Sequence, residues 1–145
     1  GAVDRLRPTI AAIAHDIIAK LEGRRDLDLI EDFAVPLPAR VIAHILGVAP
    51  DHLDAFRAWS EAIIHELHPL ANPEEKDLAI ASHRALVRFF EAEIAERRRY
   101  PRSDLITKLV MAHDESGALG EEEIISLLVN LLVAGHFTTS DLIGR

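Results

Sequence analysis

Six residues near the end of the chain include side chains that could take part in catalysis or binding. Their composition is also unusual for a helix. Ala134-Gly135-His136-Phe137-Thr138-Thr139 follows an apolar run, although glycine costs about 1 kcal/mol relative to alanine inside a helix. Gly135 lacks a side chain, so a bulky group could approach the backbone there. The Thr138 hydroxyl can bond to the carbonyl of Ala134, four residues earlier, and bend the helix. These features predict either close helix packing or a functional site.

Other residues with catalytic or metal-binding chemistry do not form a recognisable pattern. His65 and His68 could share one helix face, but Pro69 stands where a zinc-protease motif would have its second histidine. The sequence has no cysteine, which excludes disulfides, thiolate metal ligands and cysteine nucleophiles. No glycine-rich phosphate loop follows a strand pattern. We therefore expect no metal site made by protein side chains.

Composition and charge narrow the class of protein. The 145 residues are 49% hydrophobic and 28% charged, which is typical of one globular domain with a real core. The 24 acidic residues outnumber the 16 basic ones, and the net charge of -8 argues against a nucleic-acid partner and against a polybasic membrane anchor. No signal peptide or membrane-spanning segment is evident, so a cytoplasmic protein is expected.

The apolar run at 124–134 is the element around which the others should pack. Only Ser126 and Asn130 interrupt it, which predicts a buried central helix, and eleven residues are too few to span a membrane. Helical spacing and stop signals predict further helices over 4–22, 36–47, 50–68, 73–99 and 103–113. The fold class expected is all-α, with about six helices around the C-terminal one.

Several local details of these helices are also predicted. Asn72 and Ser103 are the expected N-caps, and Leu78 is expected to face the core. The run Arg97-Arg98-Arg99 is explained by the helix dipole alone, because cations are favourable at a helix C-terminus. Leu29-Ile30-Glu31 is expected to be a short extended piece.

Three segments resemble the bacterial cytochrome P-450 monooxygenases. Residues 134–139 are similar to the central I-helix motif of that family, which runs Ala/Gly-Gly-x-Asp/Glu-Thr-Thr/Ser. Residues 33–48 resemble its E-helix region, and residues 104–106 with 119–123 resemble its H helix and H–I loop, in the same order. The resemblance implies that residues 1–145 are a single partial domain, from the D helix to the middle of the I helix. The N-terminal sheet, the K helix and the cysteine-containing loop of the family would lie outside it.

The resemblance also implies roles for individual residues. Ala134 and Gly135 would face the haem on its oxygen-binding side, and Thr138 would be the alcohol that assists proton delivery. Asn130, Val133 and Phe137 would line the substrate side. Two departures from the family stand out: Phe137 occupies the place of the usual acid, and the chain contains no cysteine to serve as the axial thiolate. Haem is therefore expected in the full-length family, without thiolate binding by this chain.

Two functions from different classes follow. The first is the middle part of a haem monooxygenase that inserts one oxygen atom of O2 into a small apolar substrate, with electrons from a ferredoxin-type redox partner. The second is a stand-alone, non-catalytic helical module that binds a partner or an apolar ligand. In either case a set of residues at three- and four-residue spacing should share one apolar face through which the chain self-associates: Leu127, Leu131, Ala134, Thr138 and Leu142.

Overall fold

The computed structural model describes residues 2–66, 68–117 and 120–144; the side chains of residues 2, 3, 116, 136 and 137 lie outside this description. All regular secondary structure in the described residues is helical, which confirms the all-α class. The elements in order are α1 (Ala2–Leu21), the π-helical turn η1 (Ile30–Ala34), α2 (Pro36–Leu46), the 3-10 turn η2 (Pro50–His52), α3 (Leu53–Glu66), α4 (Pro73–Arg99), α5 (Leu105–Ser116) and α6 (Glu121–Gly144).

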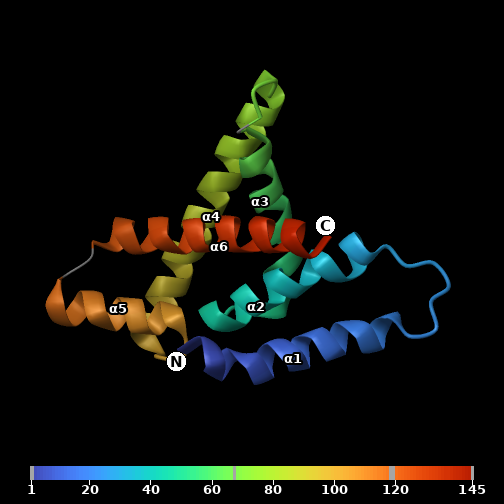
Figure 1. Ribbon diagram of the computed structural model, residues 1–145. Coiled ribbons are helices and arrows are strands. Elements are labelled where there is room, and N and C mark those ends of the chain that lie inside the picture. The colour runs from blue at the N-terminus through green and yellow to red at the C-terminus, as the bar shows by residue number, and fades with distance from the viewer. Residues whose placement is uncertain (1, 67, 118–119, 145) are drawn as a thin grey trace.

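Helix α6 is the element that most of the others contact. It packs against α2, α3, α4, α5 and η1, and Figure 1 shows it running across the molecule with the α3–α4 hairpin standing crosswise to it. Helix α1 lies along α2, on the side away from that hairpin (Figure 1). The predicted arrangement of about six helices around the C-terminal helix is confirmed.

The helix N-termini follow from local side-chain chemistry. Asn72 and Glu75 form a reciprocal capping box: the Asn72 side chain accepts from the Glu75 backbone N–H at 2.9 Å, and the Glu75 carboxylate accepts from the Asn72 N–H at 2.7 Å. The predicted cap at Ser103 is wrong by one residue, because Asp104 caps α5 by accepting from the Thr107 N–H at 2.8 Å.

The predicted extended piece at Leu29-Ile30-Glu31 is also wrong. The Asp28 carboxylate accepts from the backbone N–H groups of Ile30 at 2.9 Å and Glu31 at 3.1 Å. These bonds cap a turn of helix, and the Val35 N–H then donates to the Ile30 carbonyl at 2.9 Å in the wider spacing of a π-helix. An aspartate that supplies local hydrogen bonds therefore outweighs the strand preference of the apolar residues that follow it.

The core lies where α6 meets α2, α3, α4 and α5. Leu86, Phe90 and Ile94 of α4 are fully buried there, and Phe89 and Phe90 pack against Phe56 of α3. Leu78, predicted to face the core, is instead 59% exposed. It belongs to the outer end of α4, which extends beyond the other helices and packs only along α3 (Figure 1).

Burial of α6 is confined to one side of the helix. Its buried residues are Ile124, Ile125, Leu128, Val129 and Leu132. Leu127 and Leu131 on the opposite side are 46% and 37% exposed, so the expectation of burial all round the helix holds for only one face. At 24 residues the whole helix is also long and apolar enough to cross a membrane by length and composition, a property shared with core helices of soluble proteins.

The end of α2 yields a testable consequence. Gly47 ends the helix as predicted, with φ of 76°, and a Cβ at this position would fall within 2.5 Å of Asp104 Cβ. Gly47→Ala should therefore lower the free energy of unfolding by about 1–2 kcal/mol through backbone strain, and by about 1–3 kcal/mol more through the clash with Asp104. Gly23→Ala is the matched control, because Gly23 has φ of 84° but nothing within 4 Å of the added carbon. Equal urea midpoints for the two variants would contradict the clash.

Candidate functional site

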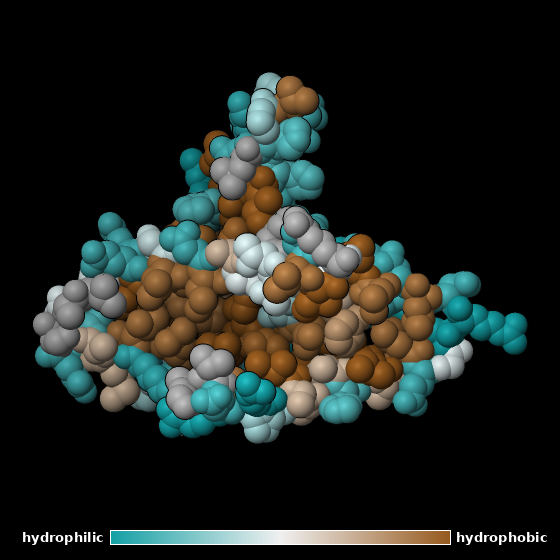
Figure 2. All heavy atoms as spheres, viewed as in Figure 1, coloured by the Kyte–Doolittle hydropathy of each residue, from teal (hydrophilic) through white to brown (hydrophobic). Residues whose placement is uncertain are grey.

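The exposed side of α6 carries the residues singled out from the sequence. The α6 stripe, as we call it, consists of residues that are all exposed and are spaced by four, three, four and four positions: Leu127, Leu131, Ala134, Thr138 and Leu142. Figure 2 shows hydrophobic residues as a broad area across this side of the molecule, along α6, whereas the tip of the α3–α4 hairpin is mostly hydrophilic. The expected exposed apolar face is therefore present.

Thr138 has the hydrogen bond expected from the sequence. Its Oγ1 donates to the carbonyl of Ala134 at 2.7 Å. The hydroxyl proton is thus held along the helix, while the lone pairs of the oxygen remain available on an exposed surface to accept a hydrogen bond from water or a ligand. Thr138 is the polar member of an otherwise apolar stripe.

Close packing between α6 and α2 explains why residue 135 is a glycine. The residue is half-buried, and a Cβ there would lie 2.8 Å from Ile42 Cδ1 of α2. The missing side chain lets α6 approach α2 closely, which is the packing explanation that the sequence left open. Of the two residues expected to face a cofactor, Ala134 lies on the exposed stripe and Gly135 lies against α2; the cofactor role of both stays a prediction.

The three residues expected on the substrate side are placed differently from one another. Asn130 is exposed beside the α6 stripe, and Val133 is half-buried and packs against the core. The side chain of Phe137 lies outside the described residues. Their role toward a substrate stays a prediction.

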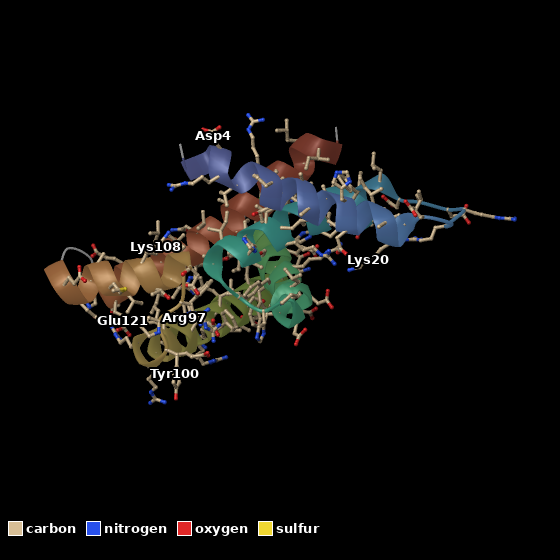
Figure 3. The ribbon with its side chains drawn as sticks, turned by 90° about the horizontal axis from the view of Figure 1, so that it is seen from below. Asp4, Lys20, Arg97, Tyr100, Lys108 and Glu121 are labelled. Carbon is tan, nitrogen blue, oxygen red and sulfur yellow. The ribbon has the colours of Figure 1, made fainter. Side chains whose placement is uncertain are left out.

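A buried arginine holds together the elements that support α6. The Arg97 side chain is fully buried; its Nε donates to Asp104 Oδ2 at 2.8 Å and its Nη2 donates to the Gly47 carbonyl at 2.7 Å. Its Nη1 lies 2.9 Å from a carboxylate oxygen of Glu93. One side chain thereby joins the ends of α4 and α2 to the start of α5, a region marked by the Arg97 label in Figure 3.

This Arg97 cluster was missed by the sequence interpretation, which assigned the three arginines to the helix dipole. That explanation fits Arg98 and Arg99, which are exposed, but not Arg97. No local signal identifies the cluster, because the Gly47 carbonyl is 50 positions away in the chain. Since α2 is also the helix that meets Gly135, the cluster helps to position the candidate site.

The surroundings of Asp104 set the acid sensitivity of the fold. Burial by itself raises the pKa of Asp104, but the hydrogen bonds from Thr107 and Arg97 outweigh it and hold the pKa below its ordinary value. In the unfolded chain the pKa of an aspartate carboxyl group is about 3.9. The stability that it contributes is therefore present above that pH and is lost as the pH falls through the lower pKa of the folded state.

We expect Asp104→Asn to weaken the dependence of the free energy of unfolding on pH in the acid range. The variant is less stable than the wild type at neutral pH, and the difference between the two should shrink as the pH falls from about 5 to about 2, because asparagine does not titrate. Other carboxylates, such as Asp16 and Asp32, whose pKa values are also lowered, contribute equally to both proteins. Urea unfolding at a series of pH values measures the difference, and parallel profiles would contradict the assignment.

The donor groups of the chain limit how it could hold a cofactor. Within the described residues, no three or more His, Asp or Glu side chains converge as a metal-binding group, and the sequence has no cysteine. The α6 stripe, by contrast, is apolar and has the small Ala134 side chain near its middle. It therefore fits one face of a flat, apolar macrocycle such as haem, without providing an axial ligand.

Comparison with known proteins defines the class to which this fold belongs. No family model matches the chain. Among solved structures, a myxobacterial cytochrome P-450 in complex with myristic acid superposes with a TM-score of 0.86 at 37% identity, over 94% of this chain and 33% of that one. The ligand-free cytochrome P-450 TbtJ1 gives a TM-score of 0.85 at 38% identity, over 98% and 37%. The fold is that of the cytochromes P-450.

Curated relatives place the chain more closely. Cytochrome P-450 107B1 of Saccharopolyspora erythraea is 38% identical over 143 residues, which are 99% of this chain and 34% of the relative. The putative cytochrome P-450 YjiB of Bacillus subtilis is 38% identical over 143 residues, 95% of this chain and 36% of the relative. The chain is similar to bacterial cytochromes P-450 over nearly its whole length, as the three sequence segments indicated, and it spans about a third of the length of these relatives.

Proposed function

We propose that the chain is the oxygen-side wall of a haem-thiolate monooxygenase, from the D helix to the middle of the I helix. The reaction is the insertion of one oxygen atom of O2 into a small apolar substrate. The observation that carries the proposal is the α6 stripe, in which Thr138 stands between Ala134 and Leu142 and its hydroxyl is bonded to the Ala134 carbonyl. Relatives support it: one, 33% identical over 148 residues, is the erythromycin C-12 hydroxylase of Saccharopolyspora erythraea.

A haem bound against the α6 stripe would supply the redox-active iron centre that activates O2. The residues of this chain would hold it by packing, with Ala134 of the stripe nearest to it, while Gly135 lies against Ile42 of α2. The thiolate ligand would come from a cysteine outside these 145 residues, because none is present among them. The chain alone would then be catalytically inactive.

The side chains around Thr138 would control water and protons. Leu127 and Leu131 would exclude bulk water if haem and substrate covered them, and this would strengthen the few polar interactions inside the closed site. Thr138 is the proposed proton-transfer group: its Oγ1 would accept a proton from an ordered water and, once its hydrogen bond to the Ala134 carbonyl is released, pass on its own proton. Phe137 stands where the family usually has an acid, and a phenyl ring carries no exchangeable proton. In this proposal water or another group takes the place of the acid and acts together with Thr138.

The substrate pocket would be lined by Asn130, Val133 and Phe137. Two structural neighbours are complexes with apolar molecules, one with myristic acid and one, from Bacillus megaterium, with testosterone. We propose an apolar substrate of this kind for the complete protein. A ferredoxin-type partner would deliver the electrons, and the protein would act in the cytoplasm.

The second candidate function is a helical module that binds an apolar ligand or a partner without catalysis. It is favoured by a hollow of about 410 Å³ between the end of α1 and η1, lined almost entirely by apolar side chains. The lining residues are Ile18, Leu21, Glu22, Leu27, Leu29 and Phe33. This function would require no haem at all, which separates it from the first.

The two functions are distinguished by the product of the complete encoding gene. That protein, supplied with reductant, a ferredoxin and ¹⁸O2, should bind haem and place one ¹⁸O atom in a hydroxylated fatty acid or steroid, as mass spectrometry would show. A gene product that purifies without haem and leaves both substrates unlabelled would overturn the monooxygenase in favour of the binding module.

A further inference from the structure

The side of α6 opposite the α6 stripe is covered by residues of this chain. Helix α6 packs more extensively against α2 than against any other element, and α2 lies between α1 and α6 (Figure 1). The two helices approach closely at Gly135. Apart from its neighbours along the helix, Ile42 is the only described residue with atoms within 4 Å of a Cβ placed at this position, with Cδ1 at 2.8 Å and Cγ1 at 3.6 Å. This contact involves no segment outside the 145 residues.

Ile42 has little freedom to move away from Gly135. Its side chain is 7% exposed and belongs to the main core, where dense packing resists rotation of the terminal methyl group. The helix that carries it is held in place as well. Leu46, one turn further along α2, is fully buried, and the Gly47 carbonyl accepts from Arg97. Ile42 is therefore a fixed surface against which the backbone of α6 packs.

The position of Gly135 determines that of Thr138. The two residues are three apart in the chain, so they lie within one helical turn, about 4.5 Å along the helix axis. The Thr138 hydroxyl is also bonded to the carbonyl of Ala134, the residue before Gly135. A displacement of α6 away from α2 at Gly135 would therefore move Ala134 and Thr138 together, toward the exposed side of the helix.

We infer that Ile42 is a positioning residue for Thr138: it sets the distance between α2 and α6, and thereby places the Thr138 hydroxyl relative to haem and substrate. The inference rests on the proposed monooxygenase function and extends it to a residue on the side of α6 away from the proposed haem. The contact is also specific in size. Because the core is closely packed, one more methyl group on α6 at Gly135 requires one fewer on α2 at Ile42.

An exchange of one methyl group between the two helices tests this role. Gly135→Ala places a carbon 2.8 Å from Ile42 Cδ1. Carbon atoms in contact normally stay at least about 3.5 Å apart, so α6 must shift by roughly 0.7 Å or more. Because a misplacement of 1 Å can cost about 10²-fold in rate, we expect this variant of the complete gene product to form about 10-fold less product per reductant consumed.

Rescue by Ile42→Val distinguishes positioning from a general loss of stability. This change removes Cδ1 and leaves the Cγ1 carbon, which lies 3.6 Å from the added Cβ, an ordinary contact distance. The double variant Gly135→Ala/Ile42→Val should therefore recover most of the wild-type ratio of product to reductant. Gly135→Ala/Ile45→Val is the matched control: Ile45 is a half-buried residue of the same helix that does not contact Gly135, and its change should not restore the ratio.

Thermal unfolding of the same proteins provides a readout that does not depend on activity. Gly135→Ala and Ile42→Val should each lower the midpoint, and the double variant should lose less than the two single variants together, because residues in contact are not additive. Gly144→Ala is the control for a glycine change in α6: a Cβ there would lie 3.4 Å from the nearest atom, in Ile30, so its midpoint and its product-to-reductant ratio should stay near those of the wild type.

The outcomes separate this inference from the proposed function. A wild-type gene product that forms no ¹⁸O-labelled product overturns the proposed function, and this inference with it. An active wild type whose ratio is unchanged by Gly135→Ala overturns the inference alone, as does a ratio that Ile42→Val fails to restore or midpoint changes that are additive. If Gly135→Ala purifies without haem, the double variant decides: recovery of haem and of the ratio supports the positioning role, and failure of either overturns it.

Discussion

Replacement of Arg97 by alanine should lower the free energy of unfolding by about 3–5 kcal/mol, the usual cost of removing one partner of a buried ion pair. The substitution leaves the Asp104 carboxylate buried without its cation, and it also leaves the Gly47 carbonyl without its donor. Because small domains are stable by only about 5–15 kcal/mol, the loss is a large fraction of the total. Urea denaturation followed by circular dichroism measures it.

Arg98→Ala is the matched control for this experiment. Arg98 is the next residue of the same helix and also makes ion pairs, with Glu121 at 2.6 Å and Asp114 at 3.5 Å, but its side chain is 35% exposed. Exposed pairs contribute about 0–1 kcal/mol, so this variant should be nearly as stable as the wild type. Similar losses for Arg97→Ala and Arg98→Ala would show that the burial of Arg97 does not matter to the stability.

Thr138→Ala should reduce product formation by the complete gene product by about 10²-fold, within the range for removal of a proton-transfer group. The consumption of reductant should fall much less, because the hydroxyl is proposed to act in proton delivery rather than in electron entry. Thr138→Ser keeps the hydroxyl and should restore most of the product. The ratio of product formed to reductant consumed is the quantity to measure.

Thr139→Ala provides the control for Thr138. Thr139 is an exposed threonine one position further along α6, so its loss changes helix composition in the same way without touching the proposed group. It should leave the product-to-reductant ratio near that of the wild type. A Thr138→Ala protein that keeps the normal ratio would show that another group delivers the proton.

The helices of this fold are readable from the sequence because their signals are local. The N-cap at Asn72 and the glycine at the end of α2 each act within a few residues, and both were predicted correctly. The errors at Leu29-Ile30-Glu31 and at Ser103 also concern short-range chemistry. There a neighbouring aspartate, Asp28 or Asp104, makes hydrogen bonds that average propensities do not anticipate.

The features that could not be read from the sequence depend on contacts between distant segments. Arg97 is an ordinary basic residue at a helix end until the Gly47 carbonyl, 50 positions away, is brought against it. The spacing of Leu127 and Leu131 indicated a shared apolar face, but how far the other residues of the apolar run are buried could only be seen in the structure. At Gly135 the sequence allowed packing or function, and the contact with Ile42 supports packing.

The central claim is that this chain forms one wall of a haem-thiolate site whose ligand comes from outside its 145 residues. The visible spectrum of the ferrous, carbon-monoxide-bound protein tests it most directly. The complete gene product should show the strongly red-shifted Soret band of thiolate-ligated haem, and the cysteine-free chain mixed with haem should not. A red-shifted band from the 145-residue chain alone, or its absence from the complete gene product, would contradict the claim.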